Sequence, residues 1–273
     1  MNDLGLDGSV AIVTGAGSLA PGIGNGKAAA VLLAEAGAKV MLVDRSLDNM
    51  KETLELIAER GGDCVPVTAD VSDEAGCAGV VASAMDTWGR VDVLVNNVGT
   101  AGPAGTVVDV AVDAWDACLR VNVTSMLLMS RFAIPHMRAA GAGSIVNISS
   151  VLGMRGGHPA IAYPTTKAAI IGLTKSMAVH HGPDGIRVNA VAPGFAYTPM
   201  VYAQGLSEEN RERRRLAAPL HTEGTGWDTG EAVLFLASDR SRWMTGTVLV
   251  VDGGLTASAG MTGDMSVTAR DTP

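Results

Sequence analysis

Residues 10–24 read Val-Ala-Ile-Val-Thr-Gly-Ala-Gly-Ser-Leu-Ala-Pro-Gly-Ile-Gly, and a helical pattern begins at the end of this stretch. The first five residues form a continuous apolar run, which is typical of a strand buried on both faces. The glycines let the backbone turn sharply, and the N-terminus of the following helix offers free N–H groups to an anion. The stretch therefore predicts a strand, an anion-binding turn and a helix, the first unit of a parallel α/β sheet.

The same alternation of short apolar runs and longer helical patterns continues along the chain. Strands are predicted at Val10–Thr14, Lys39–Asp44, Asp63–Val67, Val91–Asn96, Ser144–Ser149, Arg187–Ala192 and Val248–Val251. Helices are predicted near 24–36, 47–60, 73–87, 113–139, 160–181 and 228–238. Repeated β–α units of this kind predict a Rossmann-type α/β fold, a doubly wound parallel sheet of about seven strands between two helical layers.

The whole chain, residues 1–273, is expected to form a single domain, because no linker or repeat interrupts residues 1–256. Its core should span about 6–255. A polar stretch at about 196–217 breaks the alternation and predicts a helical excursion over the carboxyl edge of the sheet, beside the substrate. The small and polar residues 256–273 are typical of a tail that is loose or docked on a neighbour.

The composition argues against several partners. The net charge of −8 disfavours nucleic-acid binding, which needs clustered Lys and Arg. The one basic cluster, Arg211–Arg215, is interrupted by Glu212 and predicts a solvated helix face. Three widely spaced cysteines match neither a metal site nor a disulfide framework. Neither a signal peptide nor an uninterrupted membrane-spanning run is evident, so a cytoplasmic protein without a membrane partner is expected.

Asp44 ends the second predicted strand, 20 residues beyond Gly24. An acidic side chain at that place accepts hydrogen bonds from the ribose hydroxyls of a dinucleotide, and its charge repels a 2′-phosphate. The adjacent Arg45 could hold that phosphate instead, but the glycine turn itself contains neither Lys nor Arg. The pattern therefore predicts NAD rather than NADP as the cofactor.

A series of short motifs runs along the chain, and one of them is the Tyr-x-x-x-Lys pattern of Tyr163 and Lys167. The other motifs are Asn96-Asn97-Val98-Gly99, Asn122, Asn147-Ile148-Ser149-Ser150, Pro193-Gly194 with Thr198, and Val251-Asp252-Gly253-Gly254. Together these motifs resemble those of the short-chain dehydrogenase/reductase family. The resemblance covers about Leu6 to Leu255, and every motif stands in family order on the expected element.

The resemblance implies a catalytic set of Asn122, Ser150, Tyr163 and Lys167. Tyr163 would take the alcohol proton as hydride leaves for the cofactor, or return it in reduction. Ser150 would orient the substrate oxygen, and Asn122 would hold a water that links Lys167 to solvent. Local capping by Ser150 and local backbone bonding by Asn122 remain the alternatives.

The pairing of Tyr163 with Lys167 also has a physical reason. Residues i and i+4 share a helix face, and a tyrosine with a pKa of about 10 is a poor base at neutral pH. Lowering that pKa by roughly 3 units needs about 4 kcal/mol, which an ammonium at about 4 Å can supply. We therefore expect Lys167 to lower the pKa of Tyr163 and to hold the nicotinamide ribose.

The same resemblance implies a cofactor site along the strand ends. Its expected residues are Gly15, Ser18, Gly22, Ile23, Asp44, Asp70, Val71, Asn97, Gly99, Tyr163, Lys167, Pro193, Gly194, Ala196 and Thr198. The sequence departs from the family pattern where Leu19-Ala20-Pro21 is inserted, so the contacts of Gly22 and Ile23 should survive better than that of Ser18. Val98 replaces an alanine, and Pro164 limits the start of its helix to about Ala160.

The leading hypothesis is interconversion of a secondary alcohol and a ketone with NAD(H). The expected substrate pocket comprises Ser150, Leu152, Met154, His158 and Tyr163, and no metal is expected because the histidines lack metal-ligand spacing. One alternative is a 3-oxoacyl-carrier-protein reductase, against which Asp44 and the acidic charge argue. The other is a catalytically inactive nucleotide-binding sensor, against which the intact catalytic set argues. The resemblance also implies a homotetramer, with a dimer as the alternative.

Overall fold

The computed structural model describes residues 4–203 and 205–258. Seven strands form one sheet in the order β3-β2-β1-β4-β5-β6-β7, and every neighbouring pair is parallel. The strands are β1 (Val10–Thr14), β2 (Lys39–Asp44), β3 (Asp63–Thr68), β4 (Val93–Asn96), β5 (Gly143–Ile148), β6 (Ile186–Pro193) and β7 (Val248–Val251). The predicted Rossmann-type sheet is confirmed, with each strand at its expected place.

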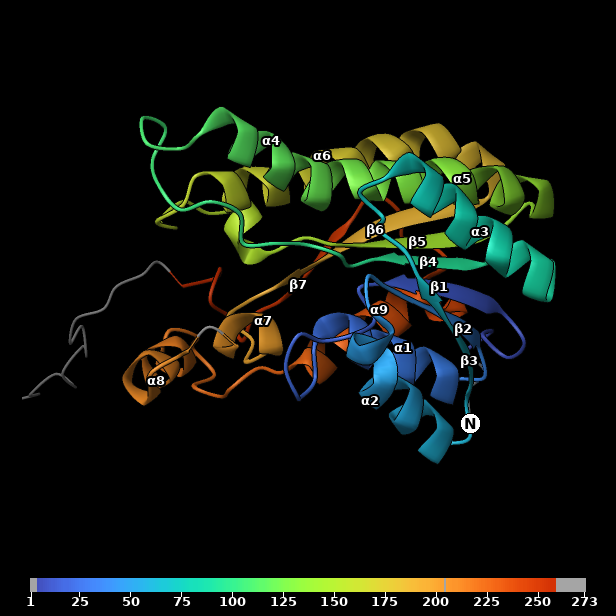
Figure 1. Cartoon of the computed structure of the whole chain (residues 1–273), viewed down its shortest axis with the longest axis horizontal. Helices are drawn as coiled ribbons and strands as arrows, with labels where there is room; N and C mark the ends of the chain where they lie inside the picture. The colour runs from blue at the N-terminus through green and yellow to red at the C-terminus, as the bar shows by residue number, and fades with distance from the viewer. Residues whose placement is uncertain (1–3, 204, 259–273) are drawn as a thin grey trace, which may run out of the picture.

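Helices cover both faces of the sheet (Figure 1). The first layer holds α1 (Asn25–Glu35), α2 (Leu47–Glu59) and α9 (Gly226–Ala237), and the second holds α3 (Glu74–Trp88), α4 (Val112–Leu119), α5 (Ser125–Ala140) and α6 (Ala162–His181). Successive residues of β1 divide between two cores: Ala11 and Val13 belong to the first, Val10 and Ile12 to the second. Because each face meets a helical layer, a central strand needs an apolar residue at every position.

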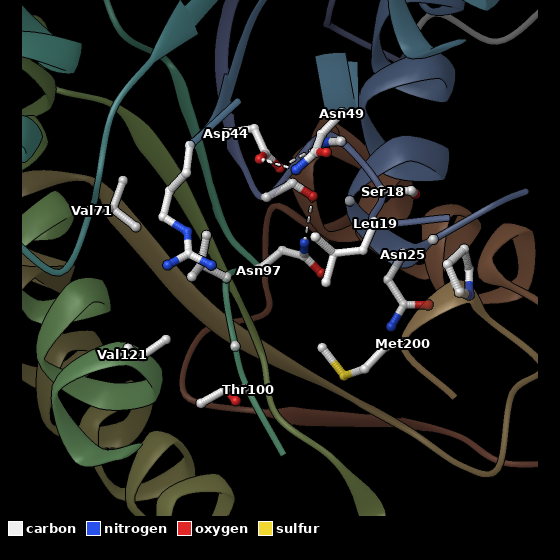
Figure 2. A pocket seen from close by; sticks show the side chains of 18 of the residues that line it. Ser18, Leu19, Asn25, Asp44, Asn49, Val71, Asn97, Thr100, Val121 and Met200 are labelled. Atoms are coloured by element: carbon white, nitrogen blue, oxygen red, sulfur yellow. Dashed lines mark hydrogen bonds between the residues drawn. The ribbon is translucent and has the colours of Figure 1, made fainter. Parts of the chain in front are cut away.

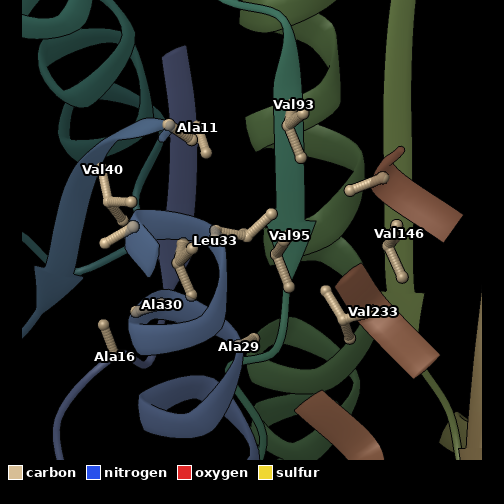
Figure 3. Close-up of a cluster of buried hydrophobic side chains, with 14 of the residues drawn as sticks. Ala11, Ala16, Ala29, Ala30, Leu33, Val40, Val93, Val95, Val146 and Val233 are labelled. Atoms are coloured by element: carbon tan, nitrogen blue, oxygen red, sulfur yellow. The ribbon is translucent and has the colours of Figure 1, made fainter. Parts of the chain in front are cut away.

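Small residues bring the first helical layer close to the sheet. Figure 3 shows Ala29, Ala30 and Leu33 of α1 beside the strand residues Val40 and Val95, and all five are buried in one cluster. An alanine side chain adds almost no thickness to a helix, so the helix axis can approach the strands closely. The alanine-rich composition of this helix is thus explained by its packing.

The edge strand β3 departs from the buried pattern. None of its residues is fully buried, and its two ends are exposed. It also contains Pro66, which lacks a backbone N–H and is tolerated on an edge strand. The mixed composition of this strand therefore follows from its place in the sheet.

The helix predicted at 113–139 is interrupted. A π-helical segment, Arg120–Thr124, separates α4 from α5, and Asn122 lies at its centre. By length and composition alone, the run Val112–Ala140 could cross a membrane, but half of its most apolar window is buried inside the protein. The apolar residues of this run therefore pack within the second helical layer.

The expected excursion after the sixth strand is present. It contains α7 (Pro199–Tyr202) and α8 (Glu208–Leu216), which lie together at one end of the molecule (Figure 1). Ser207 caps α8 by accepting a hydrogen bond from the N–H of Asn210. Glutamates in the first turn and arginines in the last turn complement the helix dipole. Residues 259–273 of the expected tail lie outside the described residues.

Gly26→Ala is expected to lower the free energy of unfolding by about 3 kcal/mol. A Cβ at residue 26 would overlap the carbonyl oxygen of Gly15 and the side-chain amide of Asn97, both of which are held in place. Urea unfolding measures the change. Gly79→Ala is the matched control, because its Cβ would enter open space on α3, and it should raise stability by up to about 1 kcal/mol. Equal unfolding midpoints for the two variants would refute this role of Gly26.

Candidate active site

Hydrogen bonds join the carboxyl ends of β1 and β4. The hydroxyl of Thr14 donates to the carbonyl of Val95 (3.2 Å) and accepts from the N–H of Asn97 (3.0 Å). The side-chain amide of Asn97 donates to the carbonyls of Thr14 (3.1 Å) and Gly15 (3.0 Å). In the strand order, β1 and β4 are neighbours whose connections leave in opposite directions, which is where open α/β sheets form a binding crevice.

A cleft of about 600 Å³ opens at this place. Eight of the expected cofactor residues line it: Gly15, Ser18, Asp44, Asp70, Val71, Asn97, Gly99 and Thr198. The expected residues outside its lining are Gly22, Ile23, Pro193, Gly194, Ala196, Tyr163 and Lys167. The structure therefore brings the first group together around one cavity, beside the ends of β1, β2 and β4.

The lining also includes residues that the motifs did not indicate. Figure 2 shows Leu19 from the inserted segment, Asn25, Asn49, Thr100 and Met200 around the same cavity. Asn25 begins α1 directly after the last glycine of the turn, so its position could have been inferred from the motif. Met200 belongs to the excursion and could not, because no sequence pattern fixes where that segment folds back.

The carboxylate of Asp44 is held in a fixed orientation. Oδ2 accepts from the N–H of Gly17 (3.2 Å), and Oδ1 accepts from the N–H of Ser46 (3.3 Å) and the amide of Asn49 (2.9 Å). Figure 2 shows Asn49 directed toward Asp44. A carboxylate has about four acceptor sites, so capacity for a further donor remains on Oδ2. Asp44 thus lies oriented at the wall of the cleft.

The other end of the cleft suits a pyrophosphate. Gly15 has a φ of 65°, a left-handed conformation that favours glycine, and α1 points its N-terminus at the turn. The hydroxyl of Ser18 is buried and has no hydrogen-bond partner among the described residues. A buried hydroxyl without a hydrogen-bond partner destabilises the fold, and a phosphate oxygen would accept a hydrogen bond from it. The residues present therefore fit a dinucleotide.

The inserted segment changes which part of the turn faces the cleft. The hydroxyl of Tyr202 on α7 donates to the carbonyl of Pro21 (2.7 Å). The N–H of Gly22 is directed to Glu52 (3.4 Å), which also pairs with the fully buried Lys27. These contacts draw the inserted segment toward α2 and α7. The structure thus places Ser18 in the lining of the cleft, and Gly22 and Ile23 outside it.

Lys167 meets Gly99, Asn122 and Tyr163 at the inner end of the cleft. Its side chain is almost fully buried, and its ammonium donates to the carbonyl of Ile148 (2.9 Å). A Cβ built on Gly99 would lie 3.5 Å from Lys167 Nζ and 3.5 Å from Asn122 Oδ1. The ammonium also lies over the Tyr163 ring, 5.6 Å from its centre. Gly99 therefore leaves the space in which these side chains converge.

The side chain of Asn122 binds the chain after β4. Its Oδ1 accepts from the N–H of Thr100 (2.7 Å), and its Nδ2 donates to the carbonyl of Thr100 (2.9 Å) and the hydroxyl of Thr166 (2.9 Å). The backbone groups that this carboxamide binds lie 22 residues away in the sequence, so the alternative of local backbone bonding is wrong for Asn122. The π-helical segment is a type of distortion frequent at functional sites, and it places Asn122 where it can make these bonds.

Ser150 combines a local bond with a place beside Tyr163. Its oxygen accepts from the N–H of Leu152 (3.1 Å) and so caps the short helical turn Val151–Gly153. Its hydroxyl proton remains available to a second partner. Hydrogen bonding with Ser150 also lowers the pKa of Tyr163. Local capping therefore does not compete with an orienting role for Ser150.

Burial dominates the ionisation of the central pair. It raises the pKa of Tyr163 above its ordinary value, although hydrogen bonding with Ser150 opposes the rise. It also lowers the pKa of Lys167 to about 8. The expected lowering of the Tyr163 pKa is therefore wrong for the protein alone, because the cost of burying a phenolate dominates.

Of the expected substrate residues, Ser150 and His158 lie beside Tyr163. The His158 ring lies 5.7 Å from the Tyr163 ring, Leu152 is partly buried and Met154 is exposed. Among the residues that the structure describes, no group of His, Cys, Asp or Glu has the arrangement of a metal site.

The arginine-rich helix α8 is not solvated on all sides. Arg211, Arg213 and Arg215 pair with glutamates, as an exposed helix face would. The guanidinium of Arg214 instead lies over the Phe195 ring, 4.8 Å from its centre, and is half-buried. The prediction of a purely solvated face is therefore wrong at Arg214, because the excursion folds this side of α8 onto the end of β6.

Comparisons with known proteins identify the family. The family model described as Enoyl-(Acyl carrier protein) reductase matches residues 19–256. A crystal structure of a Burkholderia xenovorans protein assigned to the short-chain dehydrogenases/reductases superposes with a TM-score of 0.89 at 43% identity, covering 93% of this chain and 98% of that one. The chain belongs to the short-chain dehydrogenase/reductase family.

Its curated relatives in this family are dehydrogenases and reductases. Cis-4-hydroxycyclohexanecarboxylate dehydrogenase of Sinomonas cyclohexanicum is 39% identical, over 91% of this chain and 96% of the relative. The 3-oxoacyl-[acyl-carrier-protein] reductase FabG of Thermotoga maritima is 38% identical, over 92% of this chain and 98% of the relative. This short-chain dehydrogenase/reductase is therefore an oxidoreductase that acts on CH–OH groups with a nicotinamide cofactor.

Lys167→Met is expected to change the pH dependence of stability. The folded protein holds Lys167 at a pKa of about 8, below the ordinary value of about 10.4. Between these values the unfolded chain binds the extra proton, so the wild-type free energy of unfolding rises with pH. Relative to Lys167→Met, the free energy of unfolding of the wild type should rise by about 3 kcal/mol as the pH rises from about 8 to about 10.4. Below about pH 8 the difference between the two proteins should stay constant.

Denaturant unfolding from pH 7 to pH 11 measures this difference. Lys175→Met is the matched control, because it removes an exposed lysine from the same helix. A constant difference between wild type and Lys167→Met across the window would show that Lys167 keeps its proton after folding.

Proposed function

We propose that this enzyme interconverts a secondary alcohol and a ketone, with NAD(H) as cofactor and Tyr163 as the group that moves the proton. The observation that carries the proposal is the convergence of Tyr163, Ser150 and Lys167 beside Gly99, at the end of a cleft that fits a dinucleotide. The bound nicotinamide would supply or accept the hydride. The chain's own residues orient the substrate and move the proton.

In ketone reduction, the Tyr163 phenol donates its proton to the carbonyl oxygen as that oxygen gains negative charge. The raised pKa of Tyr163 keeps this proton in place at neutral pH. The Ser150 hydroxyl donates a second hydrogen bond to the same oxygen. Lys167, with a pKa of about 8, exchanges protons in the neutral range and can restore that of Tyr163. Alcohol oxidation is the same path reversed.

Tyr163→Phe is expected to reduce kcat at least about 1,000-fold, because the ring is kept while the transferable proton is lost. NADH fluorescence should show a cofactor Kd within about threefold of the wild-type value, since the ring is retained. The phenylalanine variant therefore separates chemistry from binding. Wild-type turnover by Tyr163→Phe would contradict the assigned role.

The preference for NAD is proposed from Asp44. Its oriented carboxylate lies at the cleft wall, and a 2′-phosphate placed there would meet its negative charge. Arg45 also lines the cleft, but its charge contributes to lowering the pKa of Asp70, so it lies toward that carboxylate.

The wild type should therefore show a kcat/KM for NAD at least about 100-fold above that for NADP, and Asp44→Ser should reduce this ratio at least about tenfold. Initial rates with a panel of secondary alcohols, measured with both cofactors in parallel, give the ratio. Asn49→Ala is the control for the supporting contact, since it retains the carboxylate while removing one of its donors. A wild-type preference for NADP would overturn the assignment.

Reduction of a 3-oxoacyl-carrier-protein remains the second candidate, because the FabG relative covers almost the whole chain. The net charge of −8 argues against it, since an acidic carrier would meet an acidic surface. We also propose that the protein is a cytoplasmic homotetramer or dimer. The β7 edge strand supports association, because each of its four aliphatic residues is only partly buried, and light scattering would determine the number of subunits.

A further inference from the structure

We propose that Arg214 on α8 binds a carboxylate of the substrate, so that the preferred secondary alcohols carry a negative charge remote from the reacting carbon. This inference rests on the proposed function and goes beyond it by naming the substrate class and the residue that selects it. Three independent observations on α8 and the end of β6 support it.

The first observation is that Arg214 differs from the other arginines of its helix. Arg211 forms an ion pair with Glu223 (2.6 Å), Arg213 with Glu209 (3.0 Å) and Arg215 with Glu212 (2.6 Å). Arg214 has no acidic partner within residues 4–203 and 205–258. The helix therefore neutralises its outward charges and leaves the inward one unpaired.

The second observation is where this unpaired charge lies. The Arg214 guanidinium packs over the Phe195 ring, 4.8 Å from its centre, and Phe195 directly follows Pro193 and Gly194 at the end of β6. This contact with the ring does not use the N–H groups of the guanidinium, which stay free to donate. A planar fork held in this way matches the two oxygens of a carboxylate.

The third observation ties Arg214 to the reacting centre. The positive charge of Arg214 lowers the pKa of Tyr163, and Tyr163 in turn raises the pKa of Arg214. The two groups are therefore close enough to influence each other electrostatically. Burial lowers the pKa of Arg214, which shows that the protein partly desolvates this cation. A partly desolvated cation is stabilised when an anion joins it.

The kind of anion follows from the surrounding charge. The chain is acidic overall, with a net charge of −8, and one unpaired guanidinium balances a single negative charge. A small hydroxy acid or keto acid fits this arrangement. An acidic carrier protein or a polyphosphate does not, because either would need several cations.

A ladder of matched substrates tests the proposal. The substrates are 3-hydroxybutanoate, 4-hydroxypentanoate and 5-hydroxyhexanoate, each paired with its neutral amide, so that within a pair only the charge changes. The wild type should prefer at least one acid over its amide by 10-fold or more in kcat/KM, mainly through KM. Arg214→Gln should abolish that preference, and Arg214→Lys should restore part of it.

Arg213→Gln is the matched control, because it removes an exposed arginine one position away and should keep the acid preference. The acid-to-amide ratio cancels any effect that loss of Arg214 has on Tyr163 itself. An equal ratio in wild type and Arg214→Gln, or no acid preference in the wild type, would overturn the proposal.

A binding measurement separates this proposal from the proposed function. Calorimetry with the unreactive pair pentanoate and pentanamide reports on Arg214 without any turnover. If no alcohol is oxidised with either cofactor, the proposed function fails. Binding of pentanoate to the wild type but not to Arg214→Gln would still support the anion site, and equal binding of both compounds to both proteins would refute it.

Discussion

The site depends on the hydrogen bonds that join the carboxyl ends of β1 and β4, a contact that we call the β1–β4 joint. Parallel strands point all their carboxyl ends to one edge, but a crevice forms only where two neighbouring connections diverge. The hydrogen bonds of Thr14 and Asn97 fix that divergence, because they bind the end of each strand to the other. Everything at the edge is then placed relative to this joint: the glycine turn on one side, and Gly99 with its neighbours on the other.

Burial of charge is the second physical theme of the molecule. Two lysines are buried in the described part of the chain, and their partners differ. Lys27 pairs with the carboxylate of Glu52 and so links α1 to α2. The ammonium of Lys167 has only a backbone carbonyl as its hydrogen-bond acceptor among the described residues, and burial lowers its pKa. A cation held without an acid is costly to stability, and costs of this kind are characteristic of functional sites.

The sequence predicted the sheet well because its central strands are buried on both faces. A continuous apolar run such as Val10–Thr14 fits a fully buried strand better than a half-exposed one, and the short connections leave little freedom in strand order. The eight expected residues in the cleft follow for the same reason, since they stand at strand ends. Ranges for the helices were also close, except where the π-helical segment interrupts the run at Asn122.

The features that escaped prediction all depend on contacts between distant segments. The inward direction of Arg214 depends on how α8 folds back onto Phe195, and five consecutive residues rich in arginine do not encode that direction. The displacement of Gly22 from the cleft depends on Tyr202, which lies 181 residues beyond its hydrogen-bond partner Pro21. The ionisation of Tyr163 depends on desolvation, which a helical spacing of four residues does not reveal.

The two borders of the sheet have opposite chemistry, and this asymmetry limits how copies of the chain can join. Pro66 interrupts the donors along β3, whereas β7 presents four partly covered aliphatic residues. Proline makes an edge strand a poorer template for another strand, so edge-to-edge polymerisation is disfavoured on that side. Growth through the remaining border alone ends once two copies have met there, which favours closed, symmetric particles over filaments.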